Sequence, residues 1–265
     1  MHPILVKIGP FAVHTYGFLM ALGVALGLWF LYAQAKKQGL PAPRLLDAAF
    51  YILIISIVGA KLILLVGNFS YYTSSPKELF SLARSGGVFQ GGLAFGVIFA
   101  LWYFHKYKLP TWKVADIISA GLALGHAFGR IGCFMAGCCY GSACHLPWGA
   151  VFTNAYSHDL TGVPLHKEIH PVQVYEAILN FLNFFVLFLI LKKKKFDGQV
   201  FCFYIINYSV IRFITEYFRG DHPDKTYLFQ GSSRLLSLSY PQAFCVVGLA
   251  AGIILYQILK KRDAA

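Results

Sequence analysis

The segment from Leu45 to Phe69, LLDAAFYILIISIVGAKLILLVGNF, is apolar along nearly its whole length, and Asp47 and Lys61 are its only charged residues. A helix needs about 20 predominantly apolar residues to cross the hydrocarbon core of a bilayer. Backbone groups in lipid must be hydrogen-bonded within their own segment, which a helix achieves and a lone strand does not. This segment therefore predicts a membrane-spanning helix.

Further segments along the chain have the same character. They are Phe11 to Ala35, Val88 to Phe104, Val114 to Met135, Val172 to Leu191, Gly198 to Phe218 and Leu235 to Leu259. The whole chain is 57% hydrophobic and only 13% charged, whereas a soluble domain carries about 25% charged residues. We predict an all-α integral membrane protein of about seven transmembrane helices, forming one domain over residues 1–265, with a polar external cap loop at about residues 137–169.

Basic residues fall in alternate connections between these segments. The basic groups are Lys36, Lys37 and Arg44; Lys106, Lys108 and Lys113; Lys192 to Lys195; and Lys260, Lys261 and Arg262. Because basic loops stay in the cytoplasm, we predict an external N-terminus and a cytoplasmic C-terminus. The formal charge of +12 is explained by this distribution, so we expect no nucleic-acid partner.

Several charged residues lie within or beside the apolar segments, where a charge costs several kcal/mol. They are Lys61, Asp116, Arg130, Glu176, Arg212, Glu216 and Arg219. Such residues either pair with one another structurally, as Arg212 and Glu216 can at helical i,i+4 spacing, or mark a functional site. For Lys61, Asp116 and Glu176, structural pairing explains the charge at least as well as a functional site does.

Two arginines point more directly to a ligand. Arg130 lies among glycines, so the backbone around it is open to close approach. One face of the sixth segment gathers polar side chains at helical spacing: Tyr208, Arg212, Glu216 and Arg219. We expect the arginines to exceed the carboxylates near them and to bind an anion. Within a membrane the obvious anion is a phospholipid phosphate, which arginine binds through a bidentate fork.

Three shorter motifs contribute further candidates. In FQGGL (89–93), Gly91 and Gly92 favour close helix packing over ligand approach. In HPVQVYE (170–176), Pro171 starts a helix, so that Gln173, Tyr175 and Glu176 project from its first turns and His170 is a titratable group beside them. In HTYG (14–17), His14 and Tyr16 are placed to reach the same cavity, although an interfacial aromatic belt also explains Tyr16.

The cysteines are clustered, with Cys133, Cys138, Cys139 and Cys144 spaced Cys-x4-Cys-Cys-x4-Cys. Zinc sites more commonly use Cys-x2-4-Cys pairs that are well separated, so we predict no metal site and no cofactor. An external location permits disulfides. Cys133 is equally well explained as a small buried hydrophobe.

At these motifs the chain resembles a known family. GRIGCF (129–134) followed by GCCYG (137–141), with FQGGL upstream and HPVQVYE and NYSVIRFITEYFRGDHPD (207–224) downstream, is similar in order and spacing to the prolipoprotein diacylglyceryl transferases of bacterial inner membranes. The resemblance covers nearly the whole chain. It implies a seven-span enzyme whose partners are phosphatidylglycerol and the prolipoprotein signal peptide. The diacylglyceryl group passes to the lipobox cysteine thiol, and glycerol phosphate is released.

The resemblance also implies roles for individual residues. Arg130 and Arg212 would bind the phosphate and stabilise the leaving group, Tyr208 would support them, and Tyr16 would line the lipid cavity. The predicted catalytic residues are Arg130, Arg212, Tyr208, Gln90 and His170. The predicted substrate-contacting residues are Tyr16, His14, Gly91, Gly92, Gly132, Cys133, Gly141, Gln173, Tyr175, Glu176, Glu216 and Arg219.

The chain departs from the family pattern at two positions. Gln90 stands where the family has a histidine proposed to activate the thiol, and Cys133 stands where it has an asparagine. A glutamine cannot act as a base, so His170 or His14 would take the proton. Three alternatives stay open: the same lipid pocket with a different acceptor, a non-catalytic lipid-binding protein, and a membrane thiol redox protein using Cys133 to Cys144. The last is disfavoured because no Cys-x2-Cys pair is present.

Overall fold

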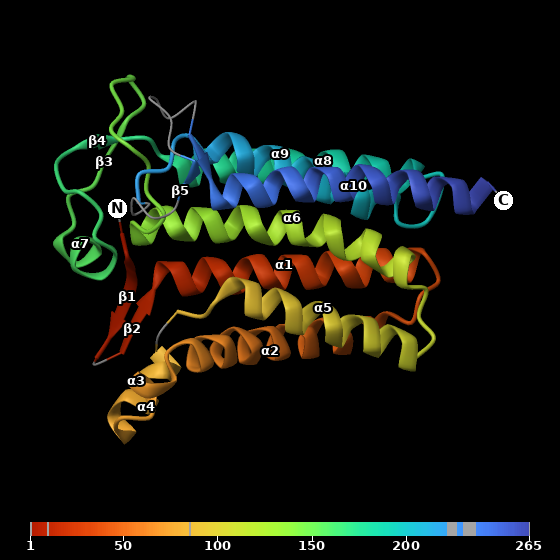
Figure 1. Ribbon diagram of the computed structural model, residues 1–265, viewed down its shortest axis with the longest axis horizontal. Helices are drawn as coiled ribbons and strands as arrows, with labels where there is room; N and C mark the ends of the chain where they lie inside the picture. The colour runs from red at the N-terminus through yellow and green to blue at the C-terminus, as the bar shows by residue number, and fades with distance from the viewer. Residues whose placement is uncertain (1, 10, 85, 222–226, 230–236, 265) are drawn as a thin grey trace. The chain divides into compact units, whose positions relative to one another are not determined.

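The computed structural model describes residues 2–9, 11–84, 86–221, 227–229 and 237–264 (Figure 1). The chain forms two compact units, which are described separately. The first unit comprises Met1–Phe30 and Ala115–Ala265, and the second comprises Leu31–Val114.

The helices of the first unit are α1 (Thr15–Lys37) as far as Phe30, α6 (Thr111–Ala136) from Ala115, α7 (Ala155–Thr161), α8 (Val172–Lys193), α9 (Gln199–Glu216) and α10 (Tyr240–Ala264). Three two-stranded antiparallel sheets accompany them: β1 (Ile4–Ile8) with β2 (Phe11–His14), β3 (Ala150–Val151) with β4 (Glu168–Ile169), and β5 (Tyr227–Phe229) with β6 (Leu238–Ser239). The second unit holds α2 (Ala42–Gly67), α3 (Phe69–Tyr72), α4 (Pro76–Arg84) and α5 (Phe89–Lys106).

Each segment predicted to span the membrane contains one long helix. Among the described residues, five helices are long and apolar enough to cross a bilayer: α1, α2, α6, α8 and α10. Helices α5 and α9 coincide with the third and sixth predicted segments but are shorter, at 18 residues each. The mostly helical membrane architecture is therefore confirmed, and the number of spans stays a prediction.

Two predicted helix starts are wrong. Phe11 to His14 form strand β2, and α1 begins at Thr15, whose backbone N–H donates to the Pro3 carbonyl at 3.0 Å. Strand β6 precedes α10, which begins at Tyr240 and not at Leu235. Residues 235 and 236 lie outside the described residues. Apolar β-strand residues and the first turn of an apolar helix have similar composition, which explains both errors.

The predicted cap segment at residues 137–169 is folded and not an open loop. It contains β3, α7 and β4, and it has a small core of Phe152, Val163 and Ile169. Helix α7 begins at an Asn154 cap that accepts the Ser157 N–H, and it ends at Gly162, whose φ of 73° is in the left-handed region. The external position of this segment stays a prediction.

Glycines bring helices into close contact within each unit. In the first unit, a Cβ on Gly23 would lie 2.9 Å from the Gly125 carbonyl oxygen, and one on Gly27 would lie 3.3 Å from that of Gly121. Gly23 and Gly27, like Gly121 and Gly125, have the Gly-x3-Gly spacing typical of tightly packed membrane helices. α1 and α6 are thereby aligned side by side.

Asp116 has a structural role, as one of the two interpretations of the sequence predicted. Its carboxylate accepts the backbone N–H groups of Gly198 and Phe201, both at 2.9 Å, at the start of α9, and it pairs with Lys194 at 2.8 Å. A carboxylate is favourable at a helix N-terminus because the helix dipole is positive there. The contact fixes the short α8–α9 connection to α6.

Lys61 also has a structural role, within the second unit. Its ammonium donates to the Leu82 carbonyl at 2.8 Å. This contact joins the second half of α2 to α4.

Candidate functional site

The centre of the candidate site is Glu176, which lies in the second turn of α8 and is 1% exposed. Its Oε2 forms an ion pair with Arg130 Nε of α6, and its Oε1 pairs with Arg212 Nη1 of α9 at 3.1 Å. The Thr215 hydroxyl donates to the same Oε1 at 3.0 Å. One buried carboxylate therefore holds two guanidinium groups from two other helices.

Arg212 has a second carboxylate on its own helix. Its Nη2 lies 2.8 Å from Glu216 Oε2, so the predicted i,i+4 pair is confirmed. The Ser239 hydroxyl donates to Glu216 Oε1 at 3.2 Å and ties the pair to the start of α10. Glu216 is 6% exposed, and these contacts satisfy charges that would otherwise be costly to bury.

Arg219 follows the end of α9 and forms a bidentate pair with Asp221. The Nε–Oδ1 distance is 2.8 Å and the Nη2–Oδ2 distance is 2.9 Å. Burial works against the charge on Arg219, but the Asp221 carboxylate outweighs it, and the pKa of Arg219 is raised. The guanidinium is therefore held charged near Arg130 and Glu176.

The predicted excess of arginine over carboxylate is wrong. Arg130, Arg212 and Arg219 are matched by Glu176, Glu216 and Asp221. The prediction failed because Glu176 comes from a different helix and Asp221 lies beyond the predicted span. Among the described residues of the first unit, the contacts of Arg130 with His126 and Glu176 both involve its Nε.

A histidine that the sequence prediction left out belongs to this cluster. His126 lies one helical turn before Arg130, and its Nε2 accepts a hydrogen bond from Arg130 Nε at 3.2 Å. Its ring centroid is 5.3 Å from that of Tyr208, which stacks at 6.0 Å on Tyr204. The i,i+4 spacing of His126 and Arg130 was visible in the sequence and would have identified it.

A second group of side chains surrounds the start of α8. The Tyr175 hydroxyl accepts the Trp148 indole N–H at 2.9 Å and lies 3.2 Å from His170 Nδ1. The tyrosine oxygen has a second lone pair, so it can also accept the His170 Nδ1–H, which leaves His170 Nε2 as the basic nitrogen. The Phe218 ring packs 5.2 Å from the His170 ring and 5.9 Å from the Tyr175 ring.

Backbone pairing joins the cap segment to the end of α9. The Ser142 N–H donates to the Phe218 carbonyl at 2.8 Å, and the Gly220 N–H donates to the Tyr140 carbonyl at 3.0 Å. A Cβ on Gly220 would lie 2.5 Å from the Gly141 carbonyl carbon, and one on Gly141 would overlap the His170 backbone. These two glycines allow three chain segments to meet beside Arg219.

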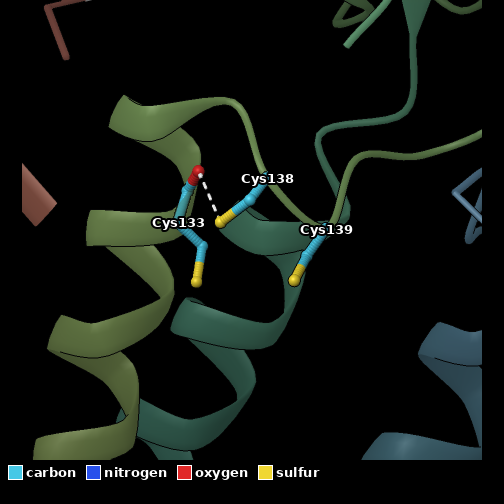
Figure 2. A group of neighbouring side chains, drawn as sticks. All are labelled: Cys133, Cys138 and Cys139. Carbon is cyan, nitrogen blue, oxygen red and sulfur yellow. Dashed lines mark hydrogen bonds between the residues drawn. The ribbon is translucent and has the colours of Figure 1, made fainter. Parts of the chain in front are cut away.

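The thiols of Cys133, Cys138 and Cys139 converge where α6 ends, with all three sulfur atoms within 4.8 Å of one another (Figure 2). The Cys138 Sγ lies 3.8 Å from the Cys133 carbonyl, and the buried Gln173 side chain donates to the Cys138 carbonyl at 2.8 Å. Hydrogen bonds from the Cys133 and Cys138 thiols lower the pKa of the Cys139 thiol, and Arg219 and Arg130 add to this effect. All three are free thiols and none forms a disulfide.

The family model described as prolipoprotein diacylglyceryl transferase matches residues 3–258. The chain belongs to the prolipoprotein diacylglyceryl transferase family. It is 32% identical over 258 residues to the phosphatidylglycerol--prolipoprotein diacylglyceryl transferase of Clostridium tetani, covering 97% of this chain and 98% of the relative. It is 31% identical over 269 residues to the protein of the same name from Pseudomonas paraeruginosa, covering 99% of this chain and 95% of that relative.

The first unit of this diacylglyceryl transferase family member brings together most of the predicted residues. Arg130, Arg212, Glu176 and Glu216 form one connected ion cluster, with Tyr208 linked to it through the His126 ring. His170 and Tyr175 are in contact with each other. Gln173 anchors the cysteine segment and not the ion cluster.

The remaining predicted residues are His14, Tyr16 and Gly132 in the first unit and Gln90, Gly91 and Gly92 in the second. The His14 ring stacks on Tyr156 with centroids 6.1 Å apart. A Cβ on Gly132 would lie 3.2 Å from Tyr16 Cδ2, so this glycine lets the tyrosine pack against α6. Gln90 is exposed in the first turn of α5.

The Gly-Gly pair of the second unit packs helices, as the sequence favoured. A Cβ on Gly91 would lie 2.6 Å from the Ile63 side chain, and one on Gly92 would lie 3.0 Å from the Ser56 carbonyl. Both glycines therefore serve the contact of α5 with α2. A substrate-binding role for them stays a prediction.

Proposed function

We propose that this transferase moves the diacylglyceryl group of phosphatidylglycerol to the lipobox cysteine thiol of prolipoproteins and releases glycerol phosphate. Family membership supports the reaction, and the names of the relatives identify phosphatidylglycerol and prolipoprotein as substrates of those proteins. The structural observation that carries the proposal is the convergence of Arg130 and Arg212 on the buried carboxylate of Glu176. Two fixed guanidinium groups in a largely dry site suit a lipid phosphate.

In the proposed reaction, the acceptor sulfur attacks the terminal glycerol carbon of the diacylglyceryl group. A carbon–sulfur bond forms as the carbon–oxygen bond to the phosphate breaks, and the phosphate leaves with the electron pair. Negative charge therefore grows on the leaving phosphate. The terminal amino groups of Arg130 and the guanidinium of Arg212 stabilise this charge, while Glu176 keeps both arginines in place.

The thiol proton needs an acceptor other than Gln90, which is not basic. We assign this role to His170, which lies two residues before the start of α8 and is oriented by its contact with the Tyr175 hydroxyl. His126 is assigned a different role: it accepts from Arg130 Nε and positions that guanidinium. An acceptor thiol is a few per cent thiolate at neutral pH, so the base accelerates the reaction without being indispensable.

The proposed setting is the bacterial inner membrane, with seven spans, an external N-terminus and the site toward the outer face. Basic residues in the last turns of α8 and α10 support this orientation: Lys192, Lys193, Lys261 and Arg262. Glu176 lies at the opposite end of α8. By the positive-inside rule, the ion cluster then belongs to the outer half of the membrane.

The test is an in vitro transfer assay with the purified protein in detergent. Phosphatidylglycerol labelled in its acyl chains is mixed with a lipobox peptide, and a matched peptide with serine in place of the lipobox cysteine is the control. We expect a mass increase of one diacylglyceryl group on the cysteine peptide alone. Labelling of neither peptide, by a protein that restores no growth to a transferase-depleted strain, would contradict the proposed reaction.

A further inference from the structure

Three thiols outside the ion cluster form a convergent donor set. Cys133 lies in the last turn of α6, and Cys138 and Cys139 follow it across a tight turn, so that all three sulfur atoms point into one space (Figure 2). Each sulfur is within 4.8 Å of the other two. Cys144, Cys202 and Cys245 are not part of this group.

The backbone between these cysteines holds the arrangement. Gly137 has a φ of 86° and Cys139 a φ of 59°, so both residues occupy the left-handed region and reverse the chain after α6. A non-glycine residue adopts this conformation at a cost of about 1 kcal/mol or more. The Gln173 side chain of α8 fixes the Cys138 carbonyl at 2.8 Å and is itself 1% exposed.

The spacing of the sulfur atoms suits a metal ion. Three sulfur atoms bound at about 2.3 Å to one central ion lie about 3.8 Å apart in tetrahedral geometry and about 4.0 Å apart in a trigonal plane. In the structure no two of the three sulfur atoms are more than 4.8 Å apart. Small side-chain rotations that shorten each sulfur–sulfur distance by about 1 Å or less therefore bring the three atoms to the spacing of a metal site.

We propose that Cys133, Cys138 and Cys139 bind one soft, thiophilic metal ion, Cu(I) or Zn(II), as thiolates. Soft thiolate ligands select these two ions over Mg(II), Ca(II) and Mn(II). Among the described residues the group has no fourth histidine, cysteine or carboxylate donor, which favours a three-coordinate ion or one completed by water. Each thiol that binds releases its proton to solvent.

The sequence spacing did not predict this site because the usual zinc patterns place two separated pairs of cysteines. Here the last turn of a helix and the turn after it supply all three ligands. Binding would join the end of α6, which carries Arg130 one helical turn before Cys133, to the segment anchored on α8. The proposal does not depend on the transfer reaction, and its test does not use activity.

The experiment measures metal binding directly. The full-length protein is purified in detergent under reducing, metal-free conditions and titrated separately with Zn(II) and with Cu(I) in the presence of a competing chelator dye. Cys133→Ser, Cys138→Ser and Cys139→Ser are compared with Cys144→Ser, which removes a thiol of the same segment outside the cluster. Alkylation of each cysteine, read by mass spectrometry, reports which thiols the metal protects.

We expect one ion per chain, protection of the three cluster thiols, and affinity at least 100-fold lower in each cluster variant but unchanged in Cys144→Ser. The alkylation pattern of the wild-type protein decides the matter even if a variant fails to fold. No protection of Cys133, Cys138 and Cys139 by either metal would overturn the proposal. A fully reduced protein that instead loses two hydrogens to form a disulfide in air, without binding metal, would overturn it equally.

Discussion

Replacing Glu176 by glutamine tests the organisation of the ion cluster most sharply. The substitution keeps the size and hydrogen-bonding shape of the side chain but removes its charge. Arg130 and Arg212, whose side chains are each 14% exposed, then lose the carboxylate they share. Removing one partner of a buried ion pair typically costs about 3–5 kcal/mol, because an uncompensated charge stays buried.

That cost converts into a measurable loss of thermal stability. For a chain of this size each kcal/mol lowers the unfolding midpoint by roughly 2–4 °C, so Glu176→Gln is expected to lower it by roughly 6–20 °C. The matched control is Glu168→Gln, which removes an exposed carboxylate from strand β4 of the same unit. A surface change of this kind costs about 0.5 kcal/mol or less.

Anionic lipid adds a second measurement. Phosphatidylglycerol can supply the negative charge that Glu176→Gln removes, so it is expected to stabilise the variant more than the wild type, by mass action on the folded state. A zwitterionic phospholipid at the same concentration is the control. Equal midpoints for Glu176→Gln and Glu168→Gln, or equal responses to both lipids, would refute the assignment of the two arginines to one shared anion site.

Three further changes follow from the structure. Burial opposes the charge on Lys194, but the carboxylates of Asp116 and Asp197 outweigh this effect and raise the pKa of Lys194. The resulting stabilisation of the folded state is complete below the unfolded-state pKa of about 10.4, and it is lost as pH rises through the higher folded-state pKa. Unfolding midpoints measured from neutral to alkaline pH should show that loss in the wild type and not in Lys194→Gln. Gly220→Ala should destabilise the protein by about 1–3 kcal/mol through overpacking, whereas Gly17→Ala, which meets open space, should not; equal denaturation curves would contradict the packing described here. His126→Ala should lower kcat/KM for phosphatidylglycerol roughly tenfold, because Arg130 loses a positioning hydrogen bond, and His126→Gln should restore it; an unchanged kcat/KM in His126→Ala would contradict the positioning role.

The helical framework could be predicted from composition because the energetic cost of exposing polar backbone in lipid leaves little choice of structure. Segments such as Leu45 to Phe69 identify themselves by length and apolarity alone. The hairpin that ends at His14 was missed, since the four residues from Phe11 to His14, next to a span, are too few to show a periodicity that separates strand from helix.

The site was predictable where its members share one helix and not where they come from different ones. The Arg212–Glu216 pair follows from i,i+4 spacing. The partnership of Arg130 with Glu176 depends on how α6 and α8 pack, which spacing along the chain does not report. His126 is the instructive omission, because its i,i+4 relation to Arg130 was available in the sequence.

The central claim is that Arg130 and Arg212 stabilise the phosphate during diacylglyceryl transfer, and the most direct test is the transfer rate of Arg130→Ala and Arg212→Ala. Arg44→Ala is the matched control, since Arg44 is an exposed arginine at the start of α2. Loss of a group that stabilises developing charge typically lowers the rate about 100- to 1,000-fold. The account predicts a loss of that size in both site variants, provided that they unfold cooperatively, and none in Arg44→Ala. Transfer by folded Arg130→Ala and Arg212→Ala at the wild-type rate would contradict it.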